Sequence, residues 1–442
     1  MLAGVTYYQS THFNRHVSIN GIQVGGLNKH DVIHKLKNVH LKNDIYIGEE
    51  RIFNGADTET GFSSEDLPEI EKLLNKQKTW WPSSKENHFT VLPAKADQNR
   101  IQTLRKQAET KLNSLNKKRQ APVDAAASLV NGRVIITKSK KGNQFDVEKM
   151  LDSFDKKSSH SDIHLEPVYL QPLAEDSPTV KKEMKSLQEL LQRTVVYQVQ
   201  NKKYPLPAKT LIRNASVTKD LKVKVDPEPL RAKIGEINRS QSTLHKNFPF
   251  RTHSGKNITV KGQSYGWTID VDKESARLKK AFETGEKSLR AYYVYGVGYS
   301  TYGIGYHTTE NNGIGYTYAE VSIEDQRIWI YKNGKMVLTT HVVTGRHDTR
   351  EDTPKGLWYI MYKESPSTLE GSEAGNPNYS VKVSYWAPFT MSGCGFHDAG
   401  WRKNWAKDAY IHNGSGGCVN TPPAVMKTVY ENLEQNEPVI IY

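Results

Sequence analysis

The segment Tyr410–Pro423 reads YIHNGSGGCVNTPP and contains Cys418, one of only two cysteines in 442 residues. Its glycine, serine and asparagine neighbours offer a structural thiol no apolar side chains to pack against. A free cysteine is only slightly ionised at neutral pH, and the thiolate is the nucleophile, so activation requires a base or positive charge nearby. The segment therefore predicts a nucleophilic cysteine in a flexible polar loop.

Three histidines in the same part of the chain are candidate bases. His397, in CGFHDAGWR, lies 21 residues before Cys418, a separation that lets a strand pair with its neighbour and bring the two side chains together. His341 alternates with two valines and is predicted to be a strand residue. His412 either points away from the site or adds a second polar group to it. His397 is thus the predicted base.

The glycines before the thiol have a separate chemical use. Gly416 and Gly417 let the backbone turn sharply, and the amides of Gly417 and Cys418 are candidate oxyanion-hole donors. Ser415 is expected to hydrogen-bond the base and hold its tautomer. Asn420 is expected to orient substrate or to cap the turn.

The alternative for any lone cysteine and histidine is a structural role, which is the commoner one. The second cysteine, Cys394 in MSGCGFH, is predicted to be a small buried residue. Whether Cys394 and Cys418 pair is left open by the sequence. Two cysteines exclude a disulfide-rich scaffold, and without zinc spacing or an HExxH motif we expect no metal and no cofactor.

The overall balance is basic, with a net charge of +13 and a pI near 9.3. Such a charge suits a polyanionic neighbour, such as a nucleic acid, an anionic membrane or a wall polymer. The lysines are spread along the chain and no basic helix with interleaved aromatics occurs, so nucleic-acid binding is not predicted. The length predicts two to four domains.

From Tyr318 onward the pattern predicts a mainly-β domain. Two alternating runs flank Lys332-Asn333-Gly334-Lys335, and Asn-Gly is a strong hairpin signal. Further strands are expected at 356–364 and 380–392, then a helix from Pro423 to Asn432 and a closing strand, PVIIY.

The preceding two thirds of the chain contain a repeat. The unit is a strand, a turn, a strand and an amphipathic helix with an N-cap. Its copies are Gly142–Phe154 and Gly266–Phe282, with a weaker one at Glu59–Leu74, and the predicted caps are Asp146, Asp270 and Ser64. Connecting helices are predicted near Ile101–Leu115 and after Ser177, with their apolar stripes in the core.

Two segments are predicted to carry no chemistry. G-(V/I)-G-Y occurs at Gly296, Gly303 and Gly313, with no phosphate-binding context, and predicts an extended glycine- and tyrosine-rich connector. The N-terminal MLAGVTY is too short to span a membrane, and is either the trailing end of an anchor or a soluble terminus.

HDAGWR followed by NGSGGCVNTPP resembles the L,D-transpeptidases of the YkuD family, whose signature is a histidine and then S-x-G-C-[VI]-[RN]. The segment from Val343 to Gly356 is also similar to that family. The resemblance covers Tyr318 to Tyr442. The repeated region, with NGIQVGGLNKHDV, resembles the peptidoglycan-binding domain often placed before this catalytic domain in Gram-positive bacteria.

The resemblance implies a multidomain protein with repeated α+β domains before a β-sandwich catalytic domain that has one main helix. The expected divisions are a juxtamembrane segment or anchor remnant, two α+β peptidoglycan-binding domains, a connector and the catalytic domain, at 1–16, 17–174, 175–294, 295–317 and 318–442. The resemblance also implies an extracytoplasmic location, in the cell wall or associated with the membrane.

The resemblance also implies a two-step acyl transfer. Cys418 attacks the carbonyl of the third residue of a peptidoglycan tetrapeptide stem and expels D-alanine. A side-chain amine of another stem then takes the thioester, giving a 3→3 cross-link. His397 would be the base, Ser415 would orient it, and the amides of Gly417 and Cys418 would hold the oxyanion.

Further residues are assigned to substrate binding on the same basis. They are Tyr385, Trp386, Trp401, His412, Gly416 and Asn420. Carbapenems are expected to acylate the thiol, as they do in family members.

One position departs from the family pattern, because Gly416 stands where a histidine is usual. We expect this to affect efficiency, with His412 partly substituting. Three alternatives remain: an L,D-carboxypeptidase, in which water takes the acyl group; a wall-binding protein with weakened catalysis; and, with least support, a general cysteine peptidase, since no papain-type C-G-S-C-W stretch occurs.

Overall fold

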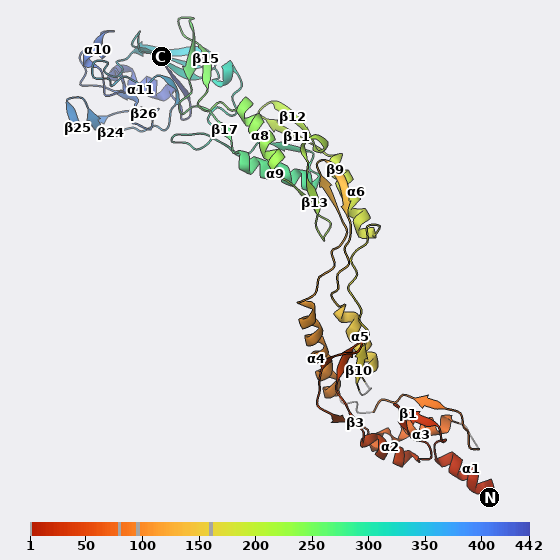
Figure 1. Ribbon diagram of the computed structural model, residues 1–442. Helices are drawn as coiled ribbons and strands as arrows, with labels where there is room; N and C mark the ends of the chain where they lie inside the picture. The colour runs from red at the N-terminus through yellow and green to blue at the C-terminus, as the bar shows by residue number, and fades with distance from the viewer. Residues whose placement is uncertain (1, 78–80, 94–97, 159–161) are drawn as a thin grey trace. The chain divides into compact units, whose positions relative to one another are not determined.

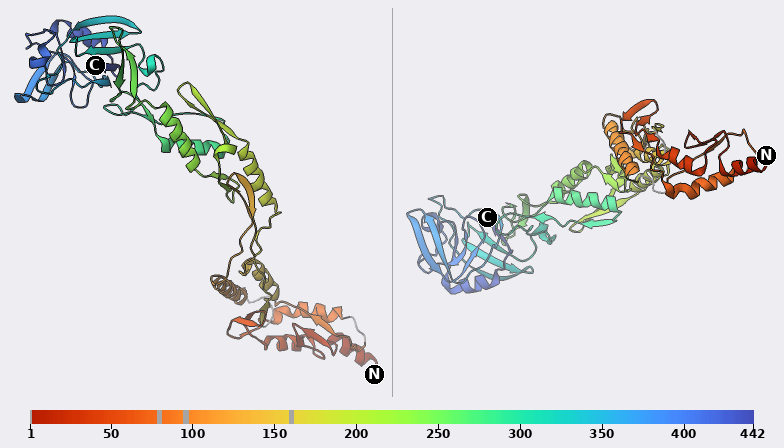
Figure 2. Two further views of the ribbon diagram at one scale, coloured as in Figure 1. Left: turned by 45° about the horizontal axis from the view of Figure 1, so that its top comes forward. Right: turned by 90° about the horizontal axis from the view of Figure 1, so that it is seen from below.

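The computed structural model describes residues 2–77, 81–93, 98–158 and 162–442 (Figures 1 and 2). The chain divides into two compact units, Met1–Ala126 with Ile136–Val180, and Ala127–Ile135 with Lys181–Tyr442. The expected five-part division stays a prediction.

The first unit combines helices with short strands in small sheets. Apolar clusters among its described residues are centred on residues such as Val17 and Leu36, and on Met150 and Phe154. None of the described helices is long and apolar enough to cross a membrane. The elements are α1 (Leu2–Thr11), β1 (Val17–Ile19), β2 (Ile22–Gln23), α2 (Lys29–Lys37), β3 (His40–Leu41), β4 (Ile45–Ile47), β5 (Glu50–Phe53), β6 (Thr58–Glu59), η1 (Ser64–Asp66), α3 (Leu67–Lys76), β7 (Asn87–Phe89), α4 (Gln98–Asn116), α5 (Val147–Lys157) and β10 (Ile163–Leu165).

Two of the three predicted helix caps are confirmed. The Asp146 carboxylate accepts the Lys149 amide at the start of α5 (3.2 Å), and Asp270 accepts that of Lys273 at the start of α9 (Val271–Thr284; 3.1 Å). The third prediction, Ser64, is wrong by one residue. Ser63 is the cap. Its hydroxyl accepts a hydrogen bond from the Glu65 amide, and its own amide donates to the Asp66 carboxylate.

The front part of the second unit places helices against two small sheets, in the orders β14-β13-β8-β9 and β12-β11-β18. Helices α8 and α9 lie side by side in Figure 1 and pack on each other. The elements are β8 (Ala126–Val130), β9 (Arg133–Thr137), α6 (Pro178–Leu191), β11 (Thr194–Val199), β12 (Lys202–Pro207), α7 (Ala208–Leu211), β13 (Ala215–Val217), β14 (Val223–Val225), α8 (Glu228–Gln241) and β18 (Ser288–Arg290).

The glycine- and tyrosine-rich segment packs its backbone tightly against aromatic side chains. A Cβ at Gly303 would stand 2.6 Å from the Cβ of Trp267, and one at Gly305, where φ is +84°, would stand 2.6 Å from the hydroxyl of Tyr265. Close packing thus explains the glycines at these two positions. The short elements around them are β15 (Asn247–Arg251), β16 (Asn257–Lys261), β17 (Thr268–Ile269), β19 (Val294–Tyr295) and η2 (Asn311–Gly313).

The C-terminal part is built on a five-stranded sheet in the order β22-β21-β20-β29-β23. The predicted hairpin is confirmed: Asn333 and Gly334 have φ of 50° and 78° and join β21 to β22. The closing strand is also confirmed as β29. The strands are β20 (Tyr318–Ser322), β21 (Arg327–Lys332), β22 (Lys335–His341), β23 (Gly356–Tyr359) and β29 (Pro438–Ile441).

A second sheet, β26-β27-β28, shares an apolar core with the first sheet and with α11 (Pro423–Asn432), the predicted helix. The single strand predicted over 380–392 is instead split at Ser384 and Tyr385, because the Asp398 carboxylate binds both of their amides at 2.8 and 2.9 Å. The elements are β24 (Ser367–Glu373), β25 (Asn376–Val383), β26 (Trp386–Pro388), β27 (Gly395–Asp398), α10 (Ala409–Asn413) and β28 (Val419–Thr421). The β-sandwich description and the repeat of whole domains stay predictions.

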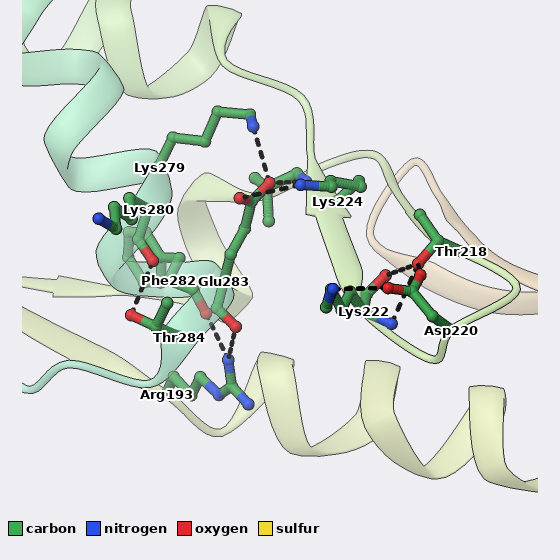
Figure 3. Close-up of polar contacts among 11 residues, drawn as sticks. Arg193, Thr218, Asp220, Lys222, Lys224, Lys279, Lys280, Phe282, Glu283 and Thr284 are labelled. Carbon is green, nitrogen blue, oxygen red and sulfur yellow. Dashed lines mark hydrogen bonds and ion pairs between the residues drawn. The ribbon is translucent and has the colours of Figure 1, made fainter.

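The C-terminal end of α9 is held by charged side chains (Figure 3). The Arg193 guanidinium donates to the carbonyls of Phe282 and Glu283, which have no partner within the helix. Burial alone would raise the pKa of Glu283, but the Lys279 hydrogen bond (2.7 Å), the Val225 amide and nearby lysines outweigh it and lower that pKa. A cation at a helix C-terminus also suits the helix dipole.

Replacing Arg193 with methionine should loosen this end of α9, because two carbonyls lose a charged donor worth about 1.5–3 kcal/mol. Amide hydrogen exchange in the last turn of α9 should become at least about tenfold faster. Arg231→Met is the matched control, since Arg231 pairs with Asp272 on the exposed surface. Equal acceleration by both variants would contradict this account.

Candidate active site

The parallel pairing of β27 with β28 creates the site. His397 is in register with Asn420, and Cys418 lies two residues before Asn420. Because side chains alternate along extended chain, the thiol, the amide and the imidazole lie on one face. The prediction that strand pairing brings the His397 and Cys418 segments together is confirmed.

The Cys418 thiol is enclosed, with 8% of the residue exposed. It packs with Leu369, Val383 and Trp386, and its Sγ donates to the carbonyl of Gly393 at 3.4 Å. Burial, and then the nearby Cys394 sulfur, raises the pKa of Cys418 to about 12. The thiol is therefore protonated at neutral pH in this arrangement.

The His397 ring is fixed in one tautomer. Its Nδ1–H donates to the backbone carbonyl of Asp398 at 2.9 Å, which leaves Nε2 as an acceptor. Burial lowers the pKa of His397, so the imidazole is neutral at neutral pH. The rings of Trp386 and Trp401 lie 5.9 and 5.7 Å from it, centroid to centroid. A neutral base thus stands on the same face as a neutral thiol.

Arg402 completes a network that the sequence analysis did not predict. With the Asn420 amide nitrogen facing His397, it donates to Nε2 at 3.0 Å, and the amide oxygen accepts from Arg402 at 3.0 Å. Arg402 also donates to the backbone carbonyl of Asn413, at the end of α10. Asn420 therefore acts on the base, in addition to any contact with substrate.

Ser415 hydrogen-bonds the backbone of the loop that carries the nucleophile. Its hydroxyl donates to the carbonyl of Cys418 at 2.6 Å and accepts from the amide of Gly417 at 3.2 Å. Among the described residues no hydrogen bond joins Ser415 to His397, so the orienting role expected of Ser415 falls to the Asp398 carbonyl and to Asn420. A Cβ at Gly417, where φ is +116°, would stand 2.9 Å from the sulfur of Cys394, which explains the glycine.

The other predicted site residues differ in whether they contact His397 or Cys418. Trp401 is half-exposed beside the base, whereas Tyr385 packs on Tyr430. His412 is exposed on α10 and bonds Asp348 at 3.0 Å, and no contact between it and Cys418 is found among the described residues. Gly416 lies under the β24–β25 hairpin, where a Cβ would stand 3.1 Å from that of Glu373.

The chain was compared with known families and solved structures. Residues 316–441 match the L,D-transpeptidase catalytic domain family, YkuD, and residues 182–290 match a family described as peptidoglycan binding. An NMR structure of the catalytic domain of the Enterococcus faecium L,D-transpeptidase is 40% identical over 28% of this chain and 96% of that one, with a TM-score of 0.27. The chain belongs to the L,D-transpeptidases of the YkuD family.

Two more structures of this kind extend the comparison. The same catalytic domain acylated by ertapenem is 39% identical over 29% of the transpeptidase described here and 98% of that chain, with a TM-score of 0.27. A crystal structure of the E. faecium enzyme with its cysteine changed to serine is 29% identical over 59% of this chain and 99% of that one, with a TM-score of 0.48. The comparison with curated proteins gave no match.

A thiol with a pKa near 12 makes a direct prediction about reactivity. In a Cys394→Ala variant, alkylation of Cys418 by iodoacetamide should rise about tenfold per pH unit from pH 7 to 9, because only the thiolate reacts. Mass spectrometry of the time course measures it. A plateau at neutral pH would contradict the neutral pair and indicate a preformed thiolate–imidazolium pair.

The contact between Gly416 and the hairpin predicts the effect of restoring histidine. Gly416→His should displace the hairpin, since its Cβ alone would already crowd Glu373. Amide exchange at Ala374, whose N–H donates to Glu351 at 2.6 Å, should accelerate. Adding Glu373→Gly, which removes the crowded Cβ, should reverse this, and an equal effect in the single and double variants would rule out the crowding.

Proposed function

We propose that this transpeptidase forms 3→3 cross-links in peptidoglycan through a thioester on Cys418. The observation that carries the proposal is the placement of Cys418 and His397 on one face of two paired strands, within the family motif. The match of residues 182–290 to a peptidoglycan-binding family supports the wall polymer as the substrate. The protein then works outside the cytoplasm.

In the first step the Cys418 sulfur attacks the carbonyl of the third residue of a tetrapeptide stem. The thiol proton passes to His397 as the bond forms, because both groups start neutral. His397 then gives this proton to the departing amine, and D-alanine leaves. A thioester remains on the sulfur.

In the second step a side-chain amine of another stem attacks the thioester. The amine nitrogen forms the new amide bond, the carbon–sulfur bond breaks, and a proton lost by the amine returns to sulfur through His397. The Asp398 carbonyl holds the Nδ1–H through both steps, while the Asn420 N–H leaves Nε2 each time that nitrogen takes a proton. We assign oxyanion binding to the amides of Gly417 and Cys418, with the first exchanging its bond to Ser415.

The substrate-facing surface is assigned to the aromatic residues around the base. Trp401 is half-exposed and stacked on His397, so a stem that reaches the base must contact it. Trp386 is buried on another side of the His397 ring. A water molecule in place of the acceptor amine would make the enzyme an L,D-carboxypeptidase, so the products distinguish the two activities.

Reaction with a carbapenem tests the nucleophile. Intact mass should show one covalent adduct on the wild type and on Cys394→Ala, and none on Cys418→Ala, since only Cys418 shares a face with the base. His397→Ala should slow adduct formation by about 10²–10⁴-fold. An adduct on Cys418→Ala, or none on wild type with reduced Cys418, would contradict the proposal and favour a wall-binding protein.

A further inference from the structure

The β24–β25 hairpin presents one of its faces to the thiol. Leu369 and Val383 on this face pack with Cys418, while Glu370 on the other face is exposed. Figures 1 and 2 show the hairpin at the outer edge of the C-terminal part in each view. The hairpin therefore covers the side of the thiol that Leu369 and Val383 contact.

Glu373 ends β24 and points toward the catalytic loop. From a Cβ built at Gly416, the Cβ of Glu373 is 3.1 Å away and its Oε2 is 3.4 Å away. The next residue, Ala374, is tied to Glu351 at 2.6 Å, which fixes this end of the hairpin. The carboxylate thus occupies the space above the glycine that departs from the family pattern.

The Glu373 carboxylate has no hydrogen bond or ion pair among the described residues. Its charge reaches Arg402 and Cys418, and it raises the pKa of the thiol in addition to the larger effects of burial and Cys394. An anion at this position opposes formation of the thiolate. Its position is therefore not explained by activation of the nucleophile. A partly exposed carboxylate without a hydrogen bond or ion pair among the described residues suits a cationic ligand.

We propose that Glu373 binds the ammonium group of the acceptor stem and positions it beside the Cys418 thioester. The Glu373 carboxylate takes one proton from the ammonium and passes it to solvent, which frees the nitrogen lone pair for attack on the thioester. This inference rests on the proposed function and names the specificity residue of its second step. Amines of this kind are protonated at pH 7, so a carboxylate raises their local concentration. Water carries no such charge, and Glu373 accordingly favours transfer to the amine over hydrolysis.

The test separates the two half-reactions with a disaccharide-tetrapeptide donor and a stem tripeptide acceptor that has a free side-chain amine. Glu373→Gln should raise the KM for the acceptor about tenfold or more, and shift product from cross-linked dimer to hydrolysed donor. Acylation by a carbapenem should be at least as fast as in the wild type, because an anion next to the thiolate is removed. Glu373→Asp should restore part of the acceptor affinity.

Glu370→Gln is the matched control, since it removes a carboxylate from the exposed face of the same strand. It should leave the acceptor KM as in the wild type. An acceptor KM within twofold of wild type in Glu373→Gln would overturn the inference, as would an equal loss in acylation and transfer. Failure of the wild type to form any adduct would instead contradict the proposed function.

Discussion

The site depends on the parallel pairing of β27 with β28. That ladder sets His397 opposite Asn420, and the alternation of side chains then places the Cys418 thiol on the same face. A shift of one residue would turn the thiol away from the imidazole. The surrounding core holds the register, because Phe396 and Val419, the neighbouring residues of these strands, are buried against the five-stranded sheet and α11.

The thiol and the imidazole of the site are both neutral before substrate binds. Burial raises the pKa of Cys418 and lowers that of His397, so neither carries charge before substrate arrives. Charge then develops only as the carbonyl is attacked, when the proton moves from sulfur to nitrogen. The Asp398 carbonyl already holds the Nδ1–H, so the ring keeps its orientation, and the Asn420 N–H leaves Nε2 as the proton arrives.

The sequence predicted the parts of the site that local chemistry reveals. Spacing indicated a paired strand for His397, and Asn333-Gly334 indicated the hairpin between β21 and β22. The expectation that the Cys418 thiol has no apolar side chains to pack against was wrong, because Leu369, Val383 and Trp386 reach it from distant segments. It did not predict the hydrogen bond from His397 to the Asp398 carbonyl, because every residue has a backbone carbonyl and no sequence signal marks this one. Nor did it predict Glu373 above Gly416, since the two meet only through the folding of a hairpin far away in the chain.

The central claim is that Cys418 transfers an acyl group between peptidoglycan stems. Incubation of the purified protein with a disaccharide-tetrapeptide, followed by mass spectrometry of the products, tests it most directly. The account predicts a dimer formed with loss of one D-alanine, present with the wild type and absent with Cys418→Ala. Trimmed monomer without dimer, or dimer formed by Cys418→Ala, would contradict it.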